Sequence, residues 1–304
     1  MRARLLAFSL LTLALAACKP TTPVIPEPSL PAASTASPAA AATATAPDDN
    51  LNAVLWVQRS AEYRALALQT YRAAADHLDA ALAEKHWDAL VPEERDNAEA
   101  TAGLSPAVIL DVDETVLDNS PYQARLVRDG LEYDEVTWAA WVAEKKARAL
   151  PGVVEFAKAA EARGVTLLYL SNRAQHLQDA TLANLRAEGL PVKDASVFLG
   201  LGTFVEGCEQ NGSEKLCRRR LAGRQYRVLM QFGDQLGDFA EIVANTRDGR
   251  AAMLDAHRDW FGERWWMLPN PTYGSWEPAV FNNAWDQPRE TRRQAKRDAL
   301  ELAN

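Results

Sequence analysis

Two acidic residues stand one position apart directly after a run of apolar residues, in the segment Asp111-Val-Asp113-Glu-Thr. The four apolar residues at 107–110 predict a buried strand. Side chains alternate along a strand with a period of two, so Asp111 and Asp113 point to the same side of it. Carboxylates about 6 to 7 Å apart repel each other, and a cation that prefers oxygen ligands, such as Mg²⁺, would balance them. The alternative is a solvated turn after an edge strand.

Polar residues also follow two other predicted strands. The strand over 165–170 leads into Ser171-Asn172-Arg173. The strand over 226–232 leads into Gly-Asp234, with Asp238 four residues further along. Helix caps and solvated turns are the ordinary uses of such residues. However, the carboxyl ends of parallel strands gather at one edge of a sheet, which makes a shared site the better interpretation of three polar strand ends.

Strands and helices alternate through the chain, which predicts an α/β fold with a Rossmann-like parallel sheet covered by helices. Strands are predicted over 107–110, 165–170, 195–199, 226–232 and 265–268, and helices over 51–90 (as a pair), 134–149, 151–161, 175–188, 238–245 and 289–302. We divide the folded part into a helical accessory segment (48–100), an α/β core (101–119 and 151–255), a mainly helical cap-like insertion (120–150) and a C-terminal accessory segment (256–304).

Residues 1–17 predict a signal peptide, because a short basic start precedes an apolar run that is too short to span a bilayer. The run ends in Leu-Ala-Ala-Cys18, which resembles the bacterial lipobox, whose cysteine is lipidated and becomes the new N-terminus. An ordinary signal peptide with an incidental Cys18 is the alternative. In such lipoproteins an Asp directly after the lipidated cysteine favours retention in the inner membrane. Position 19 is Lys in this chain, so we expect an outer-membrane anchor. Residues 18–47, rich in Pro, Ala and Thr, predict a flexible linker.

Length and charge narrow the class of protein. A chain of 304 residues can bury a sizeable core in one large or two small domains. The formal net charge of −8 argues against a nucleic-acid partner, since binding to phosphate backbones relies on Lys and Arg. An acidic protein that handles phosphate groups would concentrate its positive charge at one site.

Taken in order, the motifs resemble those of the haloacid dehalogenase superfamily: Asp-x-Asp-x-Thr, a strand ending in Ser, a Lys, and Gly-Asp-x-x-x-Asp. The closer resemblance is to bacterial class C acid phosphatases, the lipoprotein 5'-nucleotidase type, and it covers about residues 51–277. It is carried by the lipobox and by four segments, which are Asp111–Tyr122, Ser171–Arg173, Phe232–Phe239 and Leu268–Glu277. The resemblance implies a haloacid dehalogenase-like fold.

The resemblance also implies roles for the acidic residues. Asp111 would attack phosphorus and form an aspartyl-phosphate, and Asp113 would act as general acid and then general base. Mg²⁺ would be bound by Asp111, by the backbone carbonyl of Asp113 and by Asp234, with Asp238 supporting it directly or through water. Ser171 would donate a hydrogen bond to a phosphoryl oxygen.

A lysine is expected to neutralise charge on the phosphoryl group, and Lys215 lies between the second and last motifs. Family members carry a Lys with a nearby Arg there, but the local sequence matches only loosely, so Lys193 stays an alternative. Either lysine could instead be a solvated surface amine. Cys208 and Cys217 bracket Lys215, and in an oxidising compartment we expect them to form a disulfide; two reduced thiols are the alternative.

Five residues are expected to contact the substrate: Thr115, Asn172, Arg173, Trp141 and Tyr273. Trp141 and Tyr273 resemble the family's aromatic clamp around a nucleoside base. Because every base has a π-face, such a clamp would select nucleoside monophosphates without reading base identity. Packing in the core is the alternative for both rings.

The sequence therefore predicts a Mg²⁺-dependent acid phosphatase or 5'-nucleotidase that acts on small phosphomonoesters and is tethered to the outer membrane. Phosphotransfer to an alcohol through the same intermediate is an alternative, as is a non-catalytic surface lipoprotein. The presence together of Asp111, Asp113, Ser171 and Asp234 argues against a non-catalytic lipoprotein. The sequence leaves open the preferred substrate, the pH optimum, the oligomeric state and the membrane face.

Overall fold

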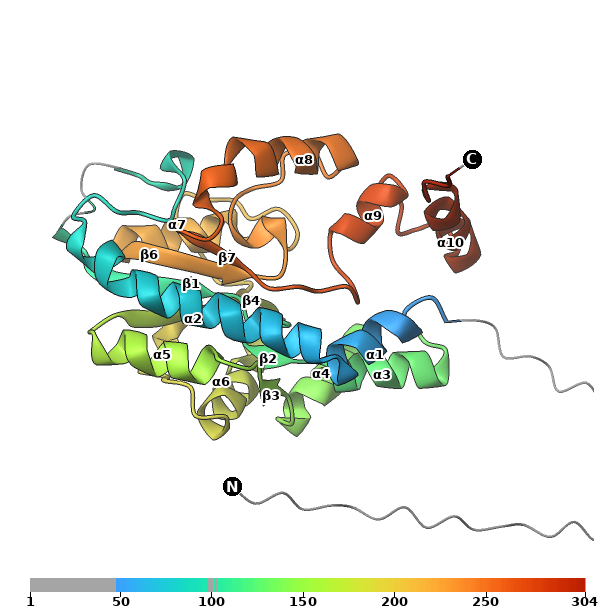
Figure 1. The fold of residues 1–304 in the computed structure, drawn as a ribbon, viewed down its shortest axis with the longest axis horizontal. Helices are drawn as coiled ribbons and strands as arrows, with labels where there is room; N and C mark the ends of the chain where they lie inside the picture. Colours follow the sequence, from blue (N-terminus) through green and yellow to red (C-terminus); the bar gives the residue numbers. More distant parts are fainter. Residues whose placement is uncertain (1–47, 98–100, 102, 304) are drawn as a thin grey trace, which may run out of the picture. The chain divides into compact units, whose positions relative to one another are not determined.

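The computed structural model describes residues 48–97, 101 and 103–303, drawn in colour in Figure 1. Contacts divide the chain into two units, Met1–Ala46 and Pro47–Asn304, and the fold described below belongs to the second. The predicted signal peptide, Cys18 and the linker up to residue 47 lie outside the described residues. Within the described part of the chain, no helix is both long and apolar enough to span a membrane.

Five parallel strands form the central sheet, in the order β5-β4-β1-β6-β7. They are β1 (Ser105–Leu110), β4 (Thr166–Ala174), β5 (Phe198–Leu201), β6 (Tyr226–Gly233) and β7 (Trp265–Met267). The middle strand, β1, is covered on both faces, because its consecutive residues 107–110 are all buried. The sheet confirms the predicted α/β fold class.

Helices cover both faces of this sheet (Figure 1). They are α1 (Leu51–Arg59), α2 (Ala61–Ala83), α3 (Ser120–Asp129), α4 (Glu135–Glu144), α5 (Val153–Ala162), α6 (Gln178–Ala187), α7 (Leu216–Gln225), α8 (Arg247–Ala256), α9 (Trp276–Val280) and α10 (Arg289–Asp298). Figure 1 shows α2 running along the sheet beside α5, and both contact it directly. The helix α7 contacts β4 and β6.

Strand register shows which face each helix covers. Phe232 of β6 lies against Tyr71 of α2 and Phe156 of α5, with ring centroids 5.3 and 4.6 Å away. The preceding residue, Gln231, points to the opposite face, because side chains alternate along a strand. Leu168 of β4 aligns with the same row of the sheet and shares a surface pocket with residues of α7. Thus α2 and α5 cover one face, and α7 covers the other.

A second, two-stranded sheet joins β2 (Leu117–Asp118) to β3 (Arg148–Ala149) in antiparallel pairing. The helices α3 and α4 lie between these strands in the chain, within the segment predicted as a cap-like insertion. The helix predicted over 134–149 ends earlier, at Glu144. The reason is that Lys145 adopts a left-handed conformation with φ of 54°, after which the chain becomes extended.

The predicted helix over 238–245 and the predicted strand over 195–199 also differ from the structure, and in each case an Asp side chain (Asp238 or Asp194) caps a 3₁₀ turn instead. The predicted helix 238–245 is absent; a 3₁₀ turn at Leu236–Asp238 precedes α8, whose first turn is capped by Thr246. The predicted strand 195–199 begins only at Phe198. Asp194 caps a preceding 3₁₀ turn by accepting a hydrogen bond from Ser196 N at 2.8 Å.

Candidate active site

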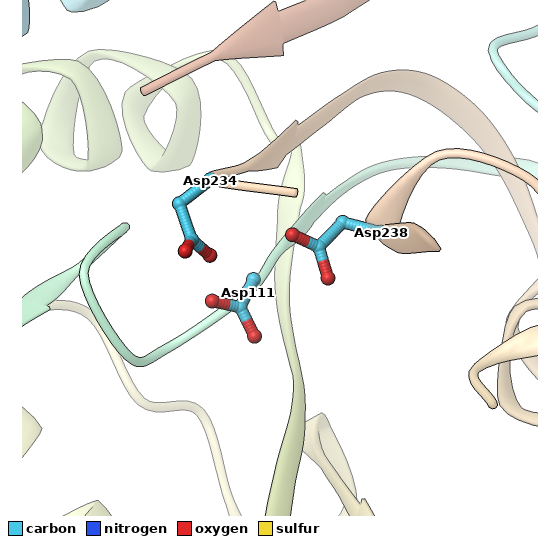
Figure 2. A group of neighbouring side chains, drawn as sticks. All are labelled: Asp111, Asp234 and Asp238. Carbon is cyan, nitrogen blue, oxygen red and sulfur yellow. The ribbon is translucent and has the colours of Figure 1, made fainter. Parts of the chain in front are cut away.

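The carboxyl ends of β1 and β6 bring three acidic side chains together. Leu110 at the end of β1 aligns with Phe232 of β6, and Asp111 N donates a 3.0 Å hydrogen bond to the Phe232 carbonyl. Asp111 and Asp234 therefore leave neighbouring strands at the same level. Figure 2 shows the carboxylates of Asp111, Asp234 and Asp238 directed toward one another. Each contributes an oxygen atom to a group whose members lie within 4.8 Å of one another.

Asp111, Asp234 and Asp238 form a three-acid cluster, and burial and repulsion disfavour charge on Asp111 and Asp234. Burial raises the pKa of Asp111 to about 7, with Lys215 opposing the rise and Asp238 adding to it. Burial, with repulsion from Asp238 and Asp111, likewise places the pKa of Asp234 well above its usual range. An oxygen-rich, like-charged set of this kind fits a divalent cation such as Mg²⁺.

Lys215 lies directly against the three-acid cluster. Its Nζ donates to Asp111 Oδ1 and to Asp238 Oδ1, the latter at 2.7 Å. Burial alone would lower the pKa of Lys215, but the two carboxylates outweigh burial and raise it. The competing Lys193 is exposed on the surface. The structure therefore places Lys215, and not Lys193, in contact with Asp111 and Asp238.

Asp113 has different partners from Asp111. Its Oδ1 accepts hydrogen bonds from Arg173 Nε at 2.9 Å, Arg173 Nη2 at 2.8 Å and Asn119 Nδ2 at 2.8 Å. Its Oδ2 has a longer contact of 3.4 Å with Ser171 Oγ. The Asp113 side chain therefore stands apart from the three-acid cluster, in a position fixed by Arg173. Of the two carboxylate oxygens of Asp113, Oδ2 is the one with the weaker hydrogen bonding.

The spacing Gly-Asp-x-x-x-Asp has a steric basis at the end of β6. A Cβ atom on Gly233 would lie 2.3 Å from the Cβ of Asp238, so only glycine lets the loop return this closely. Asp238 Oδ2 then accepts a 2.9 Å hydrogen bond from Gln235 N. Asn270, which sequence reasoning did not select as a site residue, donates to Asp234 Oδ2 at 2.8 Å.

A cavity of about 1060 Å³ opens over the three-acid cluster. Its walls include most of the predicted catalytic and binding residues, namely Asp111, Asp113, Asn172, Arg173, Lys215, Asp234, Asp238 and Tyr273. Besides Tyr273, four aromatic side chains line it: Tyr133, Trp138, Trp276 and Trp285. One cavity thus joins a charged end, suited to a phosphoryl group, to an aromatic wall.

Three residues expected to contact the substrate do not line the cavity. Ser171 is fully buried, and its Oγ accepts a 3.0 Å hydrogen bond from Arg173 N. Thr115 is fully buried beneath the site, and its carbonyl accepts a 2.8 Å hydrogen bond from Tyr71 OH. Trp141 is 2% exposed, and its Nε1 donates to Asn119 Oδ1 at 2.8 Å, which turns the indole into the core. Contrary to the expectation that Trp141 stacks on a base, Trp138 is the residue of α4 that lines the cavity.

Cys208 and Cys217 form a disulfide with an S–S distance of 2.09 Å. The bridge joins the loop that follows β5 to the first turn of α7. Lys215 lies inside the loop that it closes, two residues before Cys217. The side chain of Cys217 is buried, and the bridge ties together the chain on either side of Lys215.

Comparison with known proteins identifies the family. The HAD superfamily, subfamily IIIB (acid phosphatase), matches residues 29–276. This chain belongs to that acid phosphatase family. The class C acid phosphatase from Bacillus anthracis has a similar structure, with 33% sequence identity and a TM-score of 0.71 over 84% of this chain and 98% of that one. A structure of the class C acid phosphatase from Bacillus anthracis with tungstate bound gives a TM-score of 0.72 at the same identity and coverage.

A more distant relative of this acid phosphatase chain is the stem 31 kDa glycoprotein of Glycine max, 27% identical over 166 residues. That match spans 54% of this chain and 58% of the glycoprotein. The match therefore covers less than two thirds of the length of the glycoprotein.

The position of Lys215 leads to a first prediction. Lys215→Met should lower kcat for release of phosphate from an aryl phosphate by about 10²- to 10³-fold, because the developing charge loses its buried counter-charge. The matched variant Lys193→Met, at the exposed alternative, should keep the wild-type kcat. Steady-state kinetics on both variants decide between the lysines, and the reverse pattern would show that Lys193 is the functional one.

Proposed function

We propose that this chain is a Mg²⁺-dependent acid phosphatase that hydrolyses small phosphomonoesters through a phosphoryl group carried on Asp111. The observation that carries the proposal is the meeting of Asp111, Asp234 and Asp238 with Lys215 at the floor of one cavity. Membership of an acid phosphatase family supports the same reaction.

In the proposed first step, a carboxylate oxygen of Asp111 forms a bond to phosphorus while the bond from phosphorus to the ester oxygen breaks. Asp113 transfers a proton to the departing alcohol. Its Oδ2, which has only the long contact with Ser171 Oγ, is the oxygen available to carry that proton. Arg173 and Asn119 hold the other oxygen and so fix the direction in which the proton is delivered.

In the second step, Asp113 removes a proton from water, the water oxygen attacks phosphorus, and Asp111 leaves as a free carboxylate with inorganic phosphate as product. Lys215 stays beside Asp111 throughout and offsets charge on the phosphoryl oxygens. Asp111, Asp234 and Asp238 would hold Mg²⁺, which supplies the positive charge that three carboxylates beside one ammonium group lack.

Turnover and its metal requirement test this proposal directly. Wild-type protein should release phosphate from an aryl phosphate in Mg²⁺, lose activity in a chelator and regain it when Mg²⁺ exceeds the chelator. Asp111→Asn should lower kcat by about 10³-fold or more, because the amide is a poor nucleophile. The control Asp129→Asn changes an exposed acid and should keep kcat. A wild type that is inactive in Mg²⁺ would contradict the proposal.

We further propose that the preferred substrates are nucleoside monophosphates, with the base against the aromatic wall. Tyr273 and Trp138 line the same cavity as Asp111 and Lys215, and a flat base can stack on such rings. A cavity of about 1060 Å³ has room for a nucleoside beyond the phosphoryl group.

The substrate proposal predicts a selective effect at Tyr273. Tyr273→Ala should raise KM for nucleoside monophosphates by about tenfold, since a stacked base contributes about 1 to 3 kcal/mol. KM for glycerol phosphate, which has no ring, should stay unchanged, and Tyr273→Phe should restore the nucleotide KM. An equal rise in KM for both substrates would instead indicate a general distortion of the cavity.

We also propose that the chain is a lipoprotein anchored in the outer membrane through Cys18. Support comes from the lipobox-like segment and from the start of the family match at residue 29, beyond Cys18. Expressed in a Gram-negative host, wild-type protein should sediment with outer membranes, whereas Cys18→Ser should not, because a diacyl anchor is lost. Equal sedimentation of the two proteins would refute the lipid anchor.

A further inference from the structure

The helix α7, which begins directly after Lys215, carries the run Arg218-Arg219-Arg220. Arg218 and Arg219 are both fully buried, at 0% exposure. A buried guanidinium needs hydrogen-bond acceptors for its fixed fork of donors. Neighbouring residues of a helix point about 100° apart, so the two arginines reach different loops.

Arg219 reaches the loop that carries the metal-binding acids. Its Nη1 donates to the carbonyls of Gly237 at 2.8 Å and Asp238 at 3.3 Å. Its Nε and Nη2 form a forked ion pair with Glu94, whose Oε1 lies 2.6 Å from Nη2. Glu94 is 1% exposed and belongs to the N-terminal accessory segment. The segment therefore contacts the metal-binding loop through Arg219.

Arg218 reaches the loop at the end of β4. Its Nη1 donates to the Ser171 carbonyl at 2.6 Å, and its Nη2 donates to Asn172 Oδ1 at 2.8 Å. Nη2 also donates to the carbonyls of Ser213 at 3.1 Å and Glu214 at 2.9 Å, directly before Lys215. All four acceptors are neutral oxygens. Arg218 thus joins the Ser171 loop to the turn that carries Lys215.

Arg220 provides an internal comparison. Its Nη2 pairs with Asp96 at 2.8 Å, and both side chains are partly exposed to solvent, at 29% and 44%. This pair lies on the outer side of α7, away from the loops that carry the site. Three consecutive arginines of one helix therefore have three different sets of partners.

We propose that Arg218 and Arg219 are positioning residues with separate tasks: Arg219, held by Glu94, fixes the loop of Asp234 and Asp238 for the metal, while Arg218 fixes the Ser171 loop and Lys215 for the phosphoryl group. This inference rests on the metal and phosphoryl sites proposed above. Neither arginine touches the reacting atoms, so each acts through the loop that it holds.

Binding measurements separate the two tasks without relying on turnover. Isothermal titration calorimetry with Mg²⁺ on Arg219→Lys should show a Kd raised about tenfold, in the range typical of residues that support metal ligands. Arg218→Lys should keep the Mg²⁺ Kd within about twofold but raise the Kd of inorganic phosphate, measured in saturating Mg²⁺, by about tenfold. Arg220→Lys should change neither constant. Circular dichroism and Tm establish that each variant is folded.

Milder variants keep the test valid if a buried lysine prevents folding. Glu94→Gln removes the charge that holds Arg219 and should raise the Mg²⁺ Kd. Arg218→Gln avoids a buried lysine and should raise the phosphate Kd while leaving the Mg²⁺ Kd within about twofold. If the variants at both arginines weaken Mg²⁺ and phosphate to the same degree, in proportion to a loss of Tm, the separate tasks are refuted.

The outcome also separates this inference from the function on which it rests. A wild type that binds no Mg²⁺ would refute the proposed metal site and, with it, the task of Arg219. A wild type that binds Mg²⁺ and phosphate, with variants that fail to split the two constants, would refute only the inference. A split of the constants in a protein without turnover would support the inference while the proposed hydrolysis failed.

Discussion

The constraint on which this structure depends is the repulsion among Asp111, Asp234 and Asp238. Three carboxylates whose oxygens lie within 4.8 Å of one another, two of them buried, require positive charge in contact with them. Lys215 supplies part of it through bonds to Asp111 and Asp238. The remainder is what makes the place suited to a divalent cation and, beside it, to the phosphoryl group of a substrate. The same repulsion would separate the acids if the backbone that carries them were free to move.

Rigid support for these acids comes from two sources. The first is the sheet, because the register of β1 and β6 places Asp111 and Asp234 at one level. Gly233, which has no Cβ, lets the loop bring Asp238 close to the end of β6. The second is α7 with its buried arginines, which connect the loop of Asp234 and Asp238, the Ser171 loop and the turn of Lys215. The disulfide and Glu94 extend that support to segments outside the sheet. Preorganisation of this kind lets charged groups act without rearranging during the reaction.

The division of labour between Asp111 and Asp113 follows from their partners. Both leave the same strand end, but Asp111 faces Lys215 and the other acids, whereas Asp113 faces Arg173 and Asn119. In the proposed reaction, these partners would suit Asp111 to attack on phosphorus and Asp113 to proton transfer. The aromatic wall of the cavity, contributed by the inserted helices and the C-terminal segment, is added to this chemistry from outside the sheet. The acidic cluster and the aromatic wall therefore come from different parts of the fold.

The parallel sheet and the candidate acids were predictable from the sequence, because buried strands appear as apolar runs and their ends as polar motifs. Lys215 could be favoured only by its place between motifs, since a lysine in sequence carries no sign of its distant partners. Trp141 and the predicted helix over 238–245 failed for a related reason: Asn119 captures the indole, and the Asp238 side chain turns back to cap its own loop. In the sequence, nothing distinguishes the buried Arg218 and Arg219 from the partly exposed Arg220 beside them. The partners of Arg218 and Arg219 follow from the folded structure, because they lie on loops far apart in the chain that meet when the sheet assembles.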